Sequence, residues 1–182
     1  MMKYLTIAAL MLVAATPVAA QEKLVRASDP AGMMSTLEMA GYNPELTKDQ
    51  FGDPEINLDL DGWGASIAFY GCNEETHQDC ESIQFIGGFD TNGSFSADQV
   101  VALSNGHRYS QITIDDEGDV WVRWDILTGD GISPRLFLQA VRAYSGALSN
   151  AGVIVFPEDA APGAAEAAAD AAADAAVEAA KE

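Results

Sequence analysis

In the middle of this chain, apolar side chains recur at every second position, which is a period of two. Apolar and polar residues alternate strictly at 55–60, and two further strand-like runs follow at 65–71 and 82–89. The turn residues Asp61-Gly62 divide the first two runs, and a loop at 72–80 divides the second pair. Because strands joined by short connections pair antiparallel, the pattern predicts three consecutive antiparallel strands.

A hairpin is predicted farther along the chain. The runs at 109–115 and 119–126 flank the turn residues Asp116, Glu117 and Gly118. Alternation places one apolar set on the inward face of both strands: Ile112, Ile114, Val120, Val122 and Trp124. With the earlier three, these strands predict an antiparallel sheet of about five strands.

Three helix signals bracket these strands. Asp29-Pro30 is typical of an N-cap followed by a first-turn proline, and Ser96 with Gln99 forms a capping box. Ser133-Pro134 caps a third helix, which we expect to end at 150–152. The predicted order is helix, three strands, helix, two strands, helix, which is an α+β domain.

The two ends of the chain differ from this domain. One basic residue, a short apolar run at 5–15 and small residues at Val18 and Ala20 predict a signal peptide cleaved after Ala20. From residue 157 to 182 the chain is mostly Ala, Asp and Glu, which predicts a solvated tail. We therefore expect a signal peptide at 1–20, a domain at 21–156 and a tail at 157–182. The expected location is the periplasm or outside the cell, without membrane insertion after cleavage.

The charge of the chain excludes one class of partner. The formal net charge is −19, and removal of residues 1–20 takes away Lys3 and no acid, which gives −20. Nucleic acids and anionic membranes are recognised through stripes of Lys and Arg, whereas the eight remaining basic residues are scattered. A nucleic acid partner is not expected.

Cys72 and Cys80 are the two cysteines of the chain. A close pair in an exported protein predicts a disulfide that closes the intervening loop. The alternative is a zinc site of Cys72, His77 and Cys80, with His107 or a nearby acid as fourth ligand, but this cysteine spacing is not that of a zinc knuckle.

Catalytic signatures are missing from the sequence. It contains no Gly-x-Ser-x-Gly elbow, glycine-rich phosphate loop or His-Glu-x-x-His motif. Acidic clusters at 59–62, 90–93 and 115–119 resemble weak calcium loops, but Asp, Asn and Gly are also what tight turns require. We predict no catalytic residue, no cofactor and no metal. The alternative is a small envelope enzyme or metal-binding protein with an unrecognised site.

Aromatic residues give the candidate partner surface. Trp121 alternates to the face opposite Val120 and Val122, alongside Arg123, and Tyr70 joins them as a candidate. An exposed aromatic next to an arginine favours recognition of a partner, although a helix or a second subunit covering that face is an equal alternative.

The order of elements, together with the runs VRASDP (25–30), FYGC (69–72), CESIQF (80–85) and DDEGD (115–119), resembles YbjN domain proteins over about residues 24–150. The resemblance implies an α+β fold similar to type III secretion chaperones and a role in sensory transduction regulation, with no catalytic residue to carry over. We therefore expect a non-catalytic binding or regulatory module of the cell envelope. Its expected partner is a protein or peptide, and a second copy of the chain is a further candidate.

Overall fold

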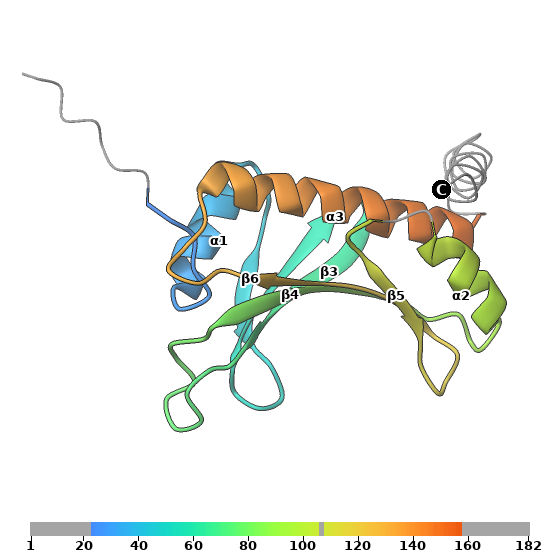
Figure 1. Cartoon of the computed structure of the whole chain (residues 1–182), viewed down its shortest axis with the longest axis horizontal. Coiled ribbons are helices and arrows are strands. Elements are labelled where there is room, and N and C mark those ends of the chain that lie inside the picture. The colour runs from blue at the N-terminus through green and yellow to red at the C-terminus, as the bar shows by residue number, and fades with distance from the viewer. Residues whose placement is uncertain (1–22, 106–107, 158–182) are drawn as a thin grey trace, which may run out of the picture.

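The computed structural model describes residues 23–105 and 108–157, which form an α+β domain (Figure 1). The elements, in chain order, are α1 (Pro30–Met39), β1 (Glu45–Lys48), β2 (Pro54–Leu60), β3 (Trp63–Tyr70), β4 (Ser82–Phe89), α2 (Ala97–Ser104), β5 (Gln111–Ile114), β6 (Val120–Leu127) and α3 (Pro134–Val155). The predicted fold class and the three predicted helices are confirmed. The predicted signal peptide and nearly all of the predicted tail lie outside the described residues.

The strands form one sheet in the order β1-β2-β3-β4-β6-β5, with every neighbouring pair antiparallel. The sheet has six strands where the sequence predicted about five, and β1 is the one that was missed. It is a four-residue edge strand, and Glu45, Leu46 and Lys48 are all exposed. A strand without a buried face leaves no period of two in the sequence.

The predicted helix N-termini are confirmed in detail. Asp29 accepts a hydrogen bond from the Gly32 amide, Ser96 and Gln99 form the capping box of α2, and Ser133 accepts from the Leu136 amide. The Lys23 ammonium also lies 2.8 Å from Asp29, and these interactions, led by the hydrogen bond from Lys23, lower the pKa of the Asp29 carboxyl.

The sheet buries one face under α3, which crosses it diagonally (Figure 1). Tyr144 is fully buried and its hydroxyl donates to the Val122 carbonyl at 2.9 Å. Burial raises the pKa of the Tyr144 phenol, against a smaller opposing effect of Arg123, so this donor stays protonated at neutral pH. The helix runs to Val155 and not only to 150–152 as predicted, because its last turn still packs against the core.

Trp124 differs from its predicted place in the core. Its side chain is half-buried at the margin of the core, 6.2 Å from Phe85 and stacked on Tyr109 at 5.2 Å between ring centroids. The reason is that β5 begins at Gln111, opposite Arg123, whereas the sequence predicted a strand from residue 109. Trp124 therefore lies just past the last paired residue of β6 on that side.

The other face of the sheet is open. All three helices lie on the core side, and within the described ranges no helix covers the opposite face (Figure 1). On β6 this face carries Trp121 and Arg123, both half-buried, and the exposed residues Asp125 and Leu127. The alternative that a helix of this part of the chain covers Trp121 is wrong.

Among the described helices, none combines the length and the apolar character needed to cross a membrane.

Candidate functional site

The Trp121 ring is held in place on the open face by three contacts. Its Nε1 donates a hydrogen bond to Asp115 Oδ2 at 2.8 Å, and the Arg123 guanidinium lies 4.8 Å from the centre of the ring. On β4, Gly88 pairs with Trp121, and a Cβ atom at Gly88 would lie 2.8 Å from the ring. The indole therefore lies directly over a residue without a side chain, in a fixed orientation.

Asp115 connects this ring to the turn between β5 and β6. Its Oδ1 accepts hydrogen bonds from the amides of Glu117 at 3.0 Å and Asp119 at 2.9 Å. The bond from Trp121 and then these backbone bonds lower the pKa of Asp115. Carboxylate oxygens of Asp115, Glu117 and Asp119 lie within 4.8 Å of one another. Turn geometry accounts for this acidic cluster, since Asp115 accepts three hydrogen bonds within the hairpin.

The predicted partner residues are brought together only in part. Arg123 contacts Trp121, and its Nη1 donates to Thr113 Oγ1 at 2.8 Å, so the guanidinium is anchored between two strands. Tyr70 lies on the same face and is 46% exposed. It is in register with Leu127 of β6, because both residues pair with Ser82 of β4. Six residues of strand separate the rows of Leu127 and Trp121, which is about 20 Å. Tyr70 therefore lies on the open face but does not contact Trp121, Asp115 or Arg123.

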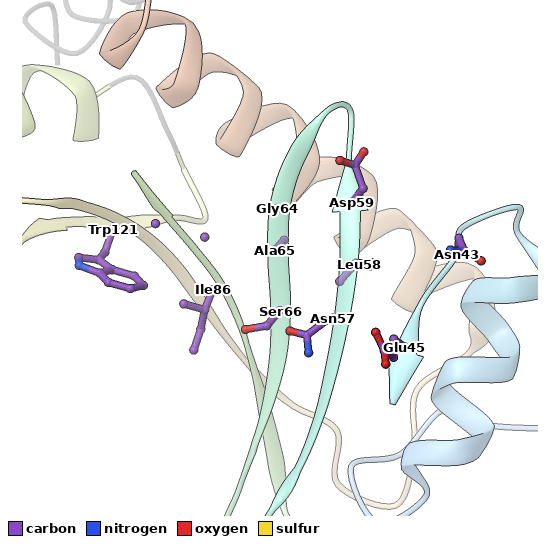
Figure 2. A pocket seen from close by; sticks show the side chains of 12 residues that line it. Asn43, Glu45, Asn57, Leu58, Asp59, Gly64, Ala65, Ser66, Ile86 and Trp121 are labelled. Atoms are coloured by element: carbon purple, nitrogen blue, oxygen red, sulfur yellow. The ribbon is translucent and has the colours of Figure 1, made fainter. Parts of the chain in front are cut away.

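Beside Trp121 the open face is hollowed (Figure 2). The hollow has a volume of about 600 Å³ and spans the sheet from β6 to β1, with Trp121 and Ile86 toward one end and Asn43 and Glu45 at the other. Small residues make the depression, namely Gly64 and Ser66 between these ends and Gly88 beneath Trp121.

Polar groups gather in this hollow. Figure 2 shows the side chains of Asn57 and Ser66 next to each other on β2 and β3, with the Asp59 carboxylate one step along β2. Glu45 of β1 adds a second carboxylate. Glu45, Asn57, Asp59 and Ser66 all carry side-chain oxygen acceptors, so the hollow can receive ammonium, guanidinium or amide N–H donors next to an aromatic ring.

The sequence pattern did not identify these polar residues as a site. Alternation at 55–60 does place Asn57 and Asp59 on one face, opposite Ile56 and Leu58, so a signal for the face exists. No local signal places β1 beside β2, or β4 beside β6, and the hollow needs both pairings.

The predicted disulfide joins Cys72 and Cys80, and the zinc alternative fails because the two sulfur atoms are bonded to each other. His77, within this loop, is half-buried and its Nδ1 lies 2.8 Å from Asp53 Oδ1. The pair ties the loop at 72–80 to the turn that follows β1. His107 lies outside the described residues.

Comparison with known proteins extends these observations. Residues 29–151 match the model of the YbjN family, whose description is "Putative bacterial sensory transduction regulator". No curated protein matches the chain. A crystal structure of an uncharacterized protein from Methanothermobacter thermautotrophicus is similar, with a TM-score of 0.50 and 10% identity over 73% of this chain and 99% of that chain. The structural similarity concerns the fold alone.

Proposed function

We propose that this chain, which belongs to the YbjN family, is a non-catalytic regulatory module of the bacterial cell envelope that binds another protein on its open sheet face. The family match covers the region in which the sequence resembled YbjN domains, and its description supports a regulatory or binding role. The family description names no reaction, and the open sheet face is what favours binding.

The observation that carries the proposal is the Trp121–Arg123 pair on a face that no described helix covers. Tryptophan and arginine dominate the energetics of protein interfaces. Both side chains already have fixed orientations through Asp115, Gly88 and Thr113, so binding would cost little side-chain entropy.

The adjoining hollow supports a partner of defined chemistry. Its carboxylates, Glu45 and Asp59, favour a lysine or arginine side chain of the partner, while the Trp121 ring offers an apolar or cation–π contact. The net charge of −19 would steer a basic partner segment toward the protein.

The envelope location rests on two features. The N-terminal run with small residues at Val18 and Ala20 supports export, and a disulfide at Cys72 and Cys80 suits an oxidising compartment.

Affinity capture from envelope extracts tests this proposal, with wild type, Trp121→Ala and Phe51→Ala compared side by side. Phe51 is 74% exposed in the turn after β1 and serves as the matched aromatic control. We expect a partner that wild type and Phe51→Ala retain and that Trp121→Ala retains at least about tenfold less, at unchanged melting temperature. Equal retention by Trp121→Ala, or a reproducible turnover of a substrate by the wild type, would refute the proposal.

A further inference from the structure

A second surface lies along the edge of β6 where the sheet is incomplete; it includes Asp125 and Leu127 of the open face but not Trp121. β6 has eight residues but β5 only four, and their pairing ends at Gln111 and Arg123. From Trp124 to Leu127, β6 pairs with β4 on one side, and in the described part of the chain no strand pairs with it on the other. An unpaired length of sheet edge offers backbone N–H and C=O groups to an added strand.

An apolar groove follows this edge. It has a volume of about 550 Å³ and lies between the second half of β6 and the first turns of α3. Its lining is mainly apolar and includes Tyr109, Trp124, Leu127, Leu136, Ala140 and Ala143. Leu127 is 84% exposed, Tyr109 54% and Leu136 48%, so large apolar side chains gather here in contact with solvent.

The short β5 explains why the groove exists. A β5 as long as β6 would lie under the outer flank of α3 and cover Leu136, Ala140 and Ala143. Because β5 begins only at Gln111, opposite Arg123, α3 overhangs an edge where one strand is lacking. Figure 1 shows β5 at the end of the sheet away from the first turns of α3. The groove therefore has the shape of a missing strand.

The charge around the groove differs from that of the rest of the chain. In a protein of net charge −19, α3 contains Arg135 and Arg142 and no carboxylate. Arg108 lies over the Tyr109 ring at 5.1 Å, and none of these three arginines has a carboxylate within 4.0 Å among the described residues. The one carboxylate that lines the groove, Asp125, accepts a hydrogen bond from the Gln84 amide. Arg108, Arg135 and Arg142 are each adjacent in sequence to a residue that lines the groove, so three cationic residues flank the groove and form its rim.

We propose that this groove binds an extended segment of a partner protein as an added strand beside Trp124–Leu127. The segment carries apolar side chains at alternate positions, which fill the groove, and acidic residues at its ends, which pair with the arginines of the rim. A second copy of the chain fits less well as the partner. A two-fold contact between identical edges would place the cationic rim of one copy against the cationic rim of the other, and the like charges would repel. This site goes beyond the open-face proposal and does not depend on Trp121.

Synthetic peptides provide the probe. The test peptide alternates valine and threonine and carries a pair of aspartates at each end. One control peptide has lysines in place of the aspartates, and a second has N-methyl groups on alternate backbone nitrogens, which remove the N–H donors that a strand needs. Binding is followed by fluorescence anisotropy, and the site is located by amide hydrogen exchange of the intact protein.

We expect the acidic peptide to bind and to protect those amides within 124–127 whose N–H groups point away from β4. Both control peptides should bind at least about tenfold more weakly. Leu127→Lys and Arg142→Glu should each weaken the acidic peptide about tenfold or more, because they remove an apolar contact or reverse a charge of the rim. Lys48→Glu is the matched charge control, since Lys48 lies on β1 at the opposite edge of the sheet, and it should leave binding unchanged.

Several outcomes would overturn the proposal: no binding of the acidic peptide, equal binding of the N-methylated peptide, or protection at β1 instead of β6. A concentration-dependent dimer that Leu127→Lys dissociates would replace the partner segment with a second copy. Trp121→Ala should bind the peptide normally, so failure at this groove and failure of the open-face proposal give different results.

Discussion

Two adjacent glycines on β4 face opposite sides of the sheet, so substitution of each by alanine tests the packing of one face. Gly87 points toward α3, where an added Cβ would lie 2.4 Å from Leu148 Cδ1 and 3.1 Å from the Tyr144 hydroxyl. Carbon atoms in good contact lie about 3.5–4.0 Å apart, so the overlap is about 1 Å. Leu148 and Tyr144 are both fully buried and have no solvent to move into.

The magnitude follows from two opposing effects. Overpacking of this kind costs about 1–3 kcal/mol, while replacing a glycine whose φ is not positive lowers the unfolded-state entropy and returns about 0.4–1 kcal/mol. We expect Gly87→Ala to lower the free energy of unfolding by about 1–2 kcal/mol, measured by urea denaturation. The melting temperature should fall by roughly 3–10 °C.

A double-mutant cycle identifies the contact. Leu148→Ala alone should cost about 2–5 kcal/mol, and the double variant with Gly87→Ala should cost clearly less than the sum, because the new methyl group enters the vacated space. Additive losses, or a Gly87→Ala protein as stable as the wild type, would refute the close packing of α3 on β4. Gly88→Ala is the neighbouring control. Its Cβ meets the Trp121 ring at the solvent side, so stability should change by less than about 0.5 kcal/mol while the Trp121 Nε1–H signal in NMR spectra shifts.

Four further expectations concern single groups. Trp121→Phe should raise the pKa of Asp115 toward its ordinary value, because the hydrogen bond from the indole is the main cause that lowers it; NMR titration measures this pKa. In the wild type, the stabilisation that Asp115 gives the folded protein is present above the pKa of this group in the unfolded chain. It is lost as the pH falls through the pKa of Asp115 in the folded protein. Tyr144 should give the opposite dependence of stability on pH. Because its pKa is raised in the folded protein, the free energy of unfolding is unaffected by this group below about pH 10 and falls as the pH rises further. Tyr144→Phe should lessen this alkaline loss, and it should cost about 1 kcal/mol at neutral pH because the hydrogen bond to Val122 is lost. Replacement of Cys72 and Cys80 together by Ser should lower the free energy of unfolding by roughly 2–3 kcal/mol, and a change near zero in denaturant titrations would contradict a stabilising disulfide. Truncation after Phe156 should leave the melting temperature nearly unchanged, whereas loss of Phe156 itself should lower it, because its ring stacks on Trp63 at 6.3 Å.

The sequence by itself determined the features that depend on near neighbours along the chain. The caps at Asp29, Ser96 and Ser133 were predictable because each side chain bonds an amide three residues away. The opposite faces of Trp121 and Val122 were predictable because strand side chains alternate with a period of two. The disulfide was predictable because its cysteines flank one short loop between paired strands.

Only the tertiary structure decided where these faces meet. The pairing of β4 with β6 joins segments separated by α2 and β5, and it places Gly88 under Trp121. The hollow with Asp59 and Glu45 needs β1 at the sheet edge, which left no pattern because its residues are exposed. The groove at Leu127 needs the late start of β5, at Gln111, and the overhang of α3. Such surfaces are sums of long-range pairings, and no short stretch of sequence contains the energies that select one pairing over another.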